Sequence, residues 1–165
     1  MTESRTYHVR LNKDYLVFSS AHFITFAGNI CERLHGHNYG LEIEVEGPLD
    51  ENAYVIDFIA LRDAAKEIIG TLDHHVLLAT QHEQIKVVAD DKEVTATFEG
   101  RRWVFPKDDC VLLDIPNTTA EKLAEYIAGE LVEKLGLGSQ IPFSRLSVAV
   151  DENRGQWGVF RLGVA

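Results

Sequence analysis

Three histidines and a cysteine lie close together near the start of the chain. His35 and His37 are two residues apart in "CERLHGHNYG", and Cys31 precedes His35 by four residues. In a strand, residues two apart point to the same face, so both imidazoles can reach one ion. His22, which ends the preceding predicted strand in "SSAHF", joins them if the two strands pair. Three imidazoles with an open fourth position are typical of catalytic Zn²⁺, whereas an isolated H-x-H pair is ordinary surface decoration.

Two further groups of residues have the chemistry to move protons at such a site. Cys31 fits a zinc ligand, a small buried hydrophobe, or a general base, because a thiolate near zinc and an imidazole has a lowered pKa. Asp73 and His74, in "LDHHVLL", fit a simple turn cap. Alternatively, the Asp73 carboxylate orients and charges the His74 imidazole, which then relays protons with Cys31.

A third set of polar residues lies late in the chain. Glu152, in "AVDENRG", fits a plain turn residue, but in a closed pocket its carboxylate would accept two N–H bonds from a guanidine-like heterocycle edge. Thr118, Thr119 and Glu121, in "PNTTAEKL", are explained first as the cap of a helix, with Thr118 and Glu121 spaced as a capping box. Contact with a ligand is their second interpretation.

The elements that must position these residues can be predicted from periodicity. Alternating apolar and polar residues predict strands over 7–11, continuing extended to residue 23, and over 39–47. Helical spacing predicts one helix from an N-cap at Asp57 to Gly70 and a second over 118–136.

The end of the chain, 145–162, predicts a β-hairpin. This element order predicts an α+β fold in a single domain, 1–165, with two helices on one face of an antiparallel sheet. Turn signals at Asp90–Asp91 and Glu99–Gly100 predict a small β insertion between the helices, over about 80–110.

The composition limits the kinds of molecule that the protein is expected to bind. The 165-residue chain has a net charge of −10, and no cluster of Lys and Arg is present to neutralise nucleic acid or a membrane surface. Local bases remain for a phosphorylated small molecule, namely Arg33, Lys107, Arg101 and Arg102. Two cysteines and the absence of a signal-like or membrane-spanning apolar stretch lead us to expect a cytoplasmic protein.

Together these motifs resemble one known family. "FSSAHF", "CERLHGHNYGLEIEVEG", "VIDFIALR", "LDHHVLL", "PNTTAEKLAEYI" and "VAVDENRG" occur in the order seen in the 6-pyruvoyltetrahydropterin synthase family, which includes the 6-carboxytetrahydropterin synthases. The resemblance covers nearly the whole chain, apart from about Thr80 to Cys110, which looks longer than is usual in the family. It implies the tunnelling fold: a four-stranded antiparallel sheet with two helices on one face, and trimers whose sheets close into a barrel, often paired into hexamers. Active sites in the family lie between subunits.

The resemblance also implies roles for single residues and a reaction. The substrate in family members is 7,8-dihydroneopterin triphosphate. The implied roles are zinc ligands for His22, His35 and His37; catalytic base for Cys31; its proton-relay partners for Asp73 and His74; pterin-ring anchor and proton relay for Glu152; and contact with the ring for Thr118 and Thr119.

The spacing of Cys31 and His35 favours the 6-carboxytetrahydropterin branch, which serves the 7-deazaguanine and queuosine route and releases acetaldehyde and triphosphate. Two other products stay open. One is 6-pyruvoyltetrahydropterin, and the other is 6-hydroxymethyl-dihydropterin for folate synthesis, which Glu32 suggests because "CE-x-x-HGH" resembles a branch that uses a glutamate. A barrel protein that merely binds a pterin is the non-catalytic alternative. A purine- or urate-handling relative is disfavoured by the three histidines.

Overall fold

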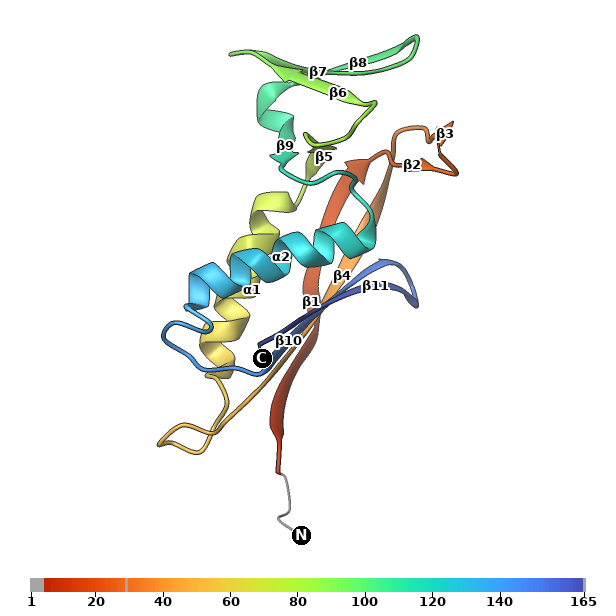
Figure 1. Ribbon diagram of the computed structural model, residues 1–165. Helices are drawn as coiled ribbons and strands as arrows, with labels where there is room; N and C mark the ends of the chain where they lie inside the picture. The colour runs from red at the N-terminus through yellow and green to blue at the C-terminus, as the bar shows by residue number, and fades with distance from the viewer. Residues whose placement is uncertain (1–4, 29, 165) are drawn as a thin grey trace.

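The computed structural model describes residues 5–28 and 30–164 and shows a mixed α and β chain (Figure 1). In chain order, its elements are β1 (Tyr7–His22), β2 (Thr25–Phe26), β3 (Ile30–Cys31), β4 (His35–Gly47), α1 (Phe58–Leu72), β5 (His75–Ala79), β6 (Lys86–Ala89), β7 (Glu93–Phe98), β8 (Arg101–Pro106), the 3-10 turn η1 (Lys107–Asp109), β9 (Cys110–Leu113), α2 (Ala120–Leu135), β10 (Arg145–Asn153) and β11 (Gln156–Gly163).

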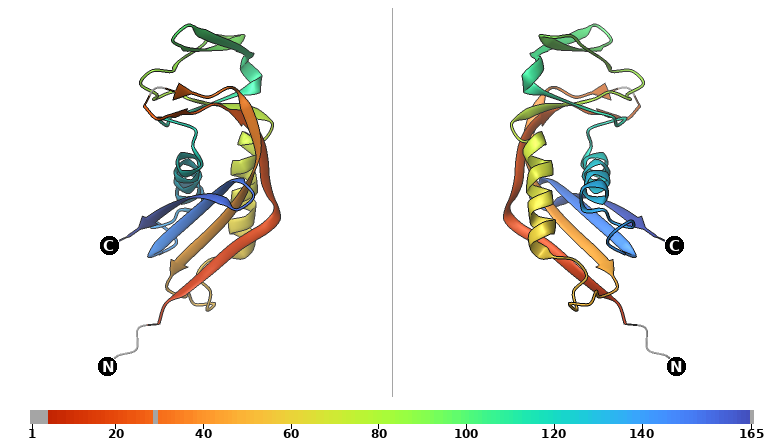
Figure 2. Two further views of the ribbon diagram at one scale, coloured as in Figure 1. Left: turned by 90° about the vertical axis from the view of Figure 1, so that its right-hand side faces the viewer. Right: turned by 90° about the vertical axis from the view of Figure 1, so that its left-hand side faces the viewer.

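The main sheet has the strand order β11-β10-β4-β1-β5-β9. Its first four strands are antiparallel, and both helices cover the same face, which confirms the predicted α+β arrangement (Figure 2). The predicted four-stranded sheet is wrong in extent, because β5 and β9 add two parallel strands beyond β1. These strands have the continuous apolar sequences "VLLA" and "CVLL". Parallel strands lack the alternation from which the other strands were predicted.

Both helices begin at side-chain caps. Asp57 caps α1 as predicted, since its carboxylate accepts from the N–H of Ile59 at 2.7 Å. The cap of α2 is Thr119, whose hydroxyl accepts from the N–H of Lys122, so the predicted capping box of Thr118 and Glu121 is wrong. Thr118 is instead buried, and its side chain lies against His22. Gly136 ends α2 in the left-handed conformation, as expected of a helix C-terminus.

Apolar side chains of the sheet and both helices form the main core. On β4, the residues at alternate positions from Tyr39 to Val45 are buried, whereas Glu42, Glu44 and Glu46 point to the opposite face. The N-terminus of α2 approaches β11 so closely that a Cβ on Gly158 would lie 2.5 Å from the backbone nitrogen of Glu121. Glycine at this position therefore lets the start of α2 rest directly on the sheet.

The segment between the helices forms a second, smaller sheet of β6, β7 and β8, as the turn signals predicted. It lies beyond the end of the main sheet, near β2 and β3 (Figure 1). Its apolar face joins Phe23, Cys31 and Leu78 in a second hydrophobic cluster, with Ile85, Val94, Ala96 and Phe98. The insertion thus packs on the segment that leads into "HGH".

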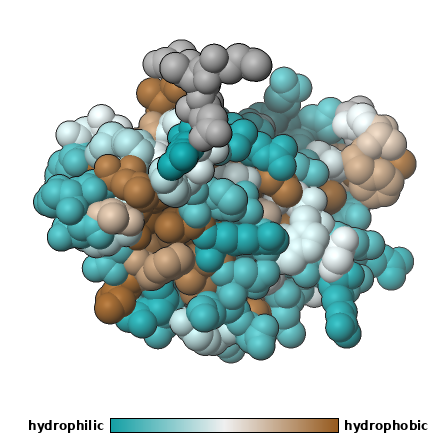
Figure 3. All heavy atoms as spheres, turned by 90° about the horizontal axis from the view of Figure 1, so that it is seen from below, coloured by the Kyte–Doolittle hydropathy of each residue, from teal (hydrophilic) through white to brown (hydrophobic). Residues whose placement is uncertain are grey.

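The opposite end of the molecule carries the β4–α1 connection. Figure 3 views the protein from below and shows apolar patches within a mainly hydrophilic surface. Exposed large apolar side chains at this connection and at the start of α1 include Tyr54, Phe58 and Ile59. None of the helices within residues 5–28 and 30–164 has the length and apolarity needed to cross a membrane.

Candidate metal centre

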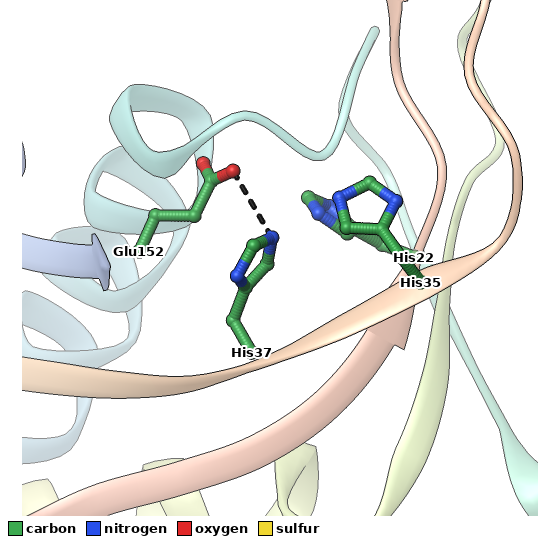
Figure 4. Close-up of side chains that lie close together, drawn as sticks. All are labelled: His22, His35, His37 and Glu152. Carbon is green, nitrogen blue, oxygen red and sulfur yellow. Dashed lines mark ion pairs between the residues drawn. The ribbon is translucent and has the colours of Figure 1, made fainter.

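The pairing of β1 with β4 brings the three predicted ligand histidines together. His22 is the register partner of His35, and Ser20 is the partner of His37, so all three imidazoles emerge on the helix side of the sheet. Together with Glu152, their ligand atoms all lie within 4.8 Å of one another (Figure 4). Ligand atoms on one tetrahedral zinc lie about 3.4 Å apart, so small side-chain movements suffice to close this set on an ion.

Glycine between the two histidines has a steric reason. A Cβ on Gly36 would lie 3.0 Å from the carbonyl oxygen of Ser20 on the neighbouring strand. Any larger residue would therefore push β4 away from β1 at the point where His22 must meet His35.

The Nδ1 atoms of His22 and His35 are already hydrogen-bonded in a way that suits metal binding. His22 Nδ1 lies 2.9 Å from the Thr118 carbonyl oxygen and 3.2 Å from its hydroxyl, while His35 Nδ1 lies 2.8 Å from the Arg33 carbonyl oxygen. A carbonyl accepts the Nδ1 proton, which leaves the Nε2 lone pair for a metal. Among the described residues, the buried Nε2 atom of His22 has no hydrogen-bond partner, and that of His37 faces the Glu152 carboxylate at 3.2 Å. The donor set therefore fits a divalent ion such as zinc.

Burial keeps one of these histidines neutral. The pKa of His22 is lowered to about 4, mainly because the ring is removed from water, and the neighbouring His35 and His37 lower it further. The hydrogen bond to Thr118 opposes this shift. At neutral pH, His22 is thus uncharged, as a metal ligand must be.

Glu152 lies nearer the histidines than the sequence suggested. The half-buried carboxylate at the end of β10 is 3.2 Å from His37 Nε2, an ion pair marked by the dashed line in Figure 4. Sequence reasoning placed Glu152 on the pterin ring and not in the metal cluster. The missing information was strand order, since β10 neighbours β4 and its last residues reach the same end of the sheet.

Tyr39 is a site residue that sequence reasoning missed. Its ring is fully buried, stacks on Phe18 with centroids 4.9 Å apart, and meets His22 and His37 edge-on. The hydroxyl has no hydrogen-bond partner among the described residues, and burial raises its pKa, with Glu152 and Glu32 adding to the rise. The available signal was its place two residues after His37 on the same strand face.

The cysteine predicted as the base lies in an apolar environment. The Cys31 side chain is only 8% exposed and packs in the second hydrophobic cluster. Burial raises the pKa of its thiol, and the nearby Arg101 guanidinium opposes that rise. Its neighbour Glu32 points to the histidines, with Oε2 3.7 Å from His35 Nε2.

Asp73 and His74 form the turn between α1 and β5. Asp73 ends α1 and accepts the N–H of Ser19 at 2.7 Å, a bond that is the main cause of its lowered pKa. His74 Nδ1 is 2.8 Å from Asp73 Oδ2, and its backbone adopts a φ of +62°. The expected orienting pair is therefore present and also closes the turn into β5. His74 borders a surface pocket of about 480 Å³ that Ser19, Asn38 and Asp109 also line.

Comparison with known proteins places these features in one family. Residues 12–162 match the family model described as 6-pyruvoyl tetrahydropterin synthase. A Methanocaldococcus jannaschii protein provisionally named 6-carboxy-5,6,7,8-tetrahydropterin synthase is 35% identical, covering 88% of this chain and 90% of its own. The Rickettsia felis protein of that name is 32% identical, covering 79% of this chain and 86% of its own.

A solved structure is similar throughout. It is a Plasmodium vivax 6-pyruvoyltetrahydropterin synthase in which a glutamate described as a catalytic residue is replaced by alanine. The likeness has a TM-score of 0.88 at 26% identity and covers 98% of this chain and all of that one. The motif resemblance is thus confirmed, and the chain belongs to the 6-pyruvoyl tetrahydropterin synthase family, whose members are lyases.

Proposed function

We propose that the protein is a zinc-dependent lyase that converts 7,8-dihydroneopterin triphosphate to 6-carboxy-5,6,7,8-tetrahydropterin, with release of acetaldehyde and triphosphate. The observation that carries the proposal is the convergence of three imidazoles and the Glu152 carboxylate, whose ligand atoms all lie within 4.8 Å of one another. The names of the relatives from Methanocaldococcus jannaschii and Rickettsia felis support this product, and with it a place in the queuosine route.

The metal ligands, Glu152 and the two threonines would each have a separate role in the reaction. Zinc, when bound, would polarise the side-chain oxygens of the substrate and acidify the neighbouring bonds. His22, His35 and His37 would hold it. Glu152 is close enough to the histidines to accept N–H bonds from a pterin edge while the substrate side chain meets the metal. Thr118 fixes the orientation of His22, and a contact of Thr118 or Thr119 with the ring stays a proposal.

A specific observation favours a second product. The Glu32 carboxylate lies beside His35, whereas the Cys31 thiol is packed among apolar side chains. A carboxylate near the metal is a suitable general base. The solved Plasmodium vivax enzyme also has a glutamate described as catalytic. Glu32 acting as the base would direct the reaction to 6-hydroxymethyl-dihydropterin.

We also propose a homo-oligomer, a trimer or hexamer, with active sites between subunits. The three ligand histidines point to the helix side of the sheet. His74 instead lines a pocket with Ser19 and Asn38, which alternate with the ligand histidines along β1 and β4 and so face the other side. A second copy would supply the relay pair.

Product analysis tests the proposal. The zinc-loaded protein is incubated with 7,8-dihydroneopterin triphosphate and an acetaldehyde trap, and products are identified by mass spectrometry. We expect 6-carboxytetrahydropterin and trapped acetaldehyde, both lost in Cys31→Ala, while zinc content is retained. If Glu32→Gln abolishes turnover and Cys31→Ala does not, with hydroxymethyl-dihydropterin as the product, the second candidate replaces the first. Zinc binding without any turnover would leave the non-catalytic pterin-binding alternative.

A further inference from the structure

Arg101, at the start of β8 in the insertion, binds the main chain between the two candidate bases. One guanidinium nitrogen donates to the carbonyl oxygen of Cys31 at 2.9 Å, and the other donates to that of Glu32 at 3.3 Å. One side chain therefore holds two successive peptide groups, which lie 69 and 70 residues away from it in the sequence. Two N–H donors on a rigid plane fix the orientation of the peptide groups they hold.

The guanidinium is itself held in place by aromatic rings. It lies 5.2 Å from the ring centroids of both Phe98 and Trp103, a distance at which a cation is attracted to a ring face. Trp103 in turn stacks on Phe23, with centroids 4.6 Å apart. Phe23 directly follows the candidate metal ligand His22, so the insertion contacts both the ligand strand and the segment that carries the two bases.

The segment held by Arg101 presents its two reactive side chains in different directions. The Cys31 thiol enters the apolar cluster, where its Sγ lies 3.5 Å from the Glu32 carbonyl oxygen. The Glu32 carboxylate points to His35. Rotation of the Cys31–Glu32 peptides would change which group faces the metal centre, and such a rotation would break both bonds from Arg101.

We propose that Arg101 is a positioning residue that holds the thiol of Cys31 in the apolar cluster and the carboxylate of Glu32 beside the metal centre, and so decides which serves as base. The last part rests on the proposed pterin lyase function. The placement of the thiol does not, and it can be tested without substrate.

Alkylation of Cys31 reports its release from the cluster. The background is Cys110→Ser, which leaves Cys31 as the sole thiol of the chain. Arg101→Gln is compared with Arg102→Gln, a matched control on the same strand whose exposed guanidinium reaches Glu93 instead. We expect iodoacetamide to modify Cys31 at least about tenfold faster in Arg101→Gln, because the thiol gains solvent access. The Arg102→Gln rate should equal that of the parent.

The direction of the change in alkylation rate distinguishes release of the Cys31 thiol from simple loss of the Arg101 charge. The groups that act on the thiol are Arg101, Glu32 and Glu99. Loss of the Arg101 cation alone would raise the thiol pKa and slow alkylation, so an unchanged or slower rate in Arg101→Gln would overturn the proposal. Guanidinium ion at millimolar concentration should restore protection to Arg101→Ala, and this rescue separates loss of the contact from general unfolding. Arg101→Lys, which keeps the charge and a donor, should lie between the parent and Arg101→Gln.

The product ratio tests the second part. With zinc content equal in all variants, Arg101→Gln should raise the ratio of 6-carboxytetrahydropterin to hydroxymethyl-dihydropterin at least about threefold, because the released thiol can then act as base in place of Glu32. Arg102→Gln should leave the ratio unchanged. An unchanged ratio with released thiol would overturn the role in choosing the base. Absence of turnover in the parent would reject the proposed function, while the alkylation result would still decide whether Arg101 positions Cys31.

Discussion

The metal centre and the Cys31–Glu32 segment lie close together in the molecule but are built in different ways. The centre is formed by two paired strands, and its histidines are fixed by register. The Cys31–Glu32 segment is held from outside, by a side chain of the β6–β8 sheet and by an apolar cluster. The first arrangement depends on local alternation, whereas the second depends on contacts between residues far apart in sequence. We therefore expect substitutions in the two regions to separate metal binding from choice of base.

Removal of a ligand should give the largest effect. His22→Ala should weaken zinc binding by about a thousandfold or more, because it removes one of three imidazoles and leaves the remaining donors poorly arranged. Competition with a chromophoric chelator measures the affinity. His8→Ala, an exposed histidine on the same strand, is the control and should bind zinc normally. Equal affinities would mean that the paired strands do not form the metal site.

Acid should destabilise the metal-free protein through the same histidine. His22 has a pKa of about 4 in the fold, below its usual value of 6.5, so between these values the unfolded chain takes up a proton that the native ring refuses. The free energy of unfolding should thus fall by up to about 3 kcal/mol as the pH drops from 6.5 to 4, with no contribution above 6.5. Urea titrations at several pH values measure it. If His22→Asn shows the same slope, burial of this ring is not the cause.

Displacing α2 should cost stability and disturb the support of His22. Gly158→Ala places a methyl group against the backbone of Ala120 and Glu121, and overpacking of this kind costs about 1–3 kcal/mol. Gly129→Ala is the control, because a Cβ there meets nothing within 4 Å and alanine stabilises a helix by about 0.5–1 kcal/mol. In denaturant unfolding, we expect Gly158→Ala to lower the free energy of unfolding and Gly129→Ala to raise it. Two equal changes would contradict the close contact of α2 with β11.

Substitutions of the adjacent Thr118 and Thr119 should affect different properties, namely zinc affinity and the free energy of unfolding. Thr118→Val removes a hydroxyl from His22 Nδ1 but keeps the Thr118 carbonyl bond, so zinc affinity should fall by about tenfold at most. Thr119→Val removes the α2 cap and should lower the free energy of unfolding by about 1 kcal/mol, with zinc affinity unchanged. Isothermal titration and urea unfolding on both variants would show whether the assignments are reversed.

The same contrast explains what could be predicted from the sequence. Alternation and helical spacing identified the antiparallel strands of the main sheet and both helices, and turn signals identified the small insertion sheet, because these features depend on neighbouring residues. The i, i+2 rule placed His35 and His37 together, and strand pairing added His22. The parallel strands β5 and β9 were missed, because a buried parallel strand has no alternation to recognise.

What could not be predicted depends on packing between distant segments. No local pattern indicated that Arg101 would reach Cys31, or that Glu152 would approach His37. Nor did any local pattern indicate that burial under the insertion would raise the pKa of the Cys31 thiol. Thr118 was mistaken for the cap because its sequence spacing fits, while its side chain lies against His22 instead.

X-ray absorption at the zinc edge tests the central claim most directly. The protein is loaded with one equivalent of zinc, and its coordination shell is compared with that of Cys31→Ala. We predict nitrogen and oxygen ligands only, at about 2.0–2.1 Å, with imidazole scattering from three histidines and no difference between the two proteins. A sulfur shell at about 2.3 Å that disappears in Cys31→Ala would contradict the account, because it would make Cys31 a zinc ligand and unite the two regions in one metal site.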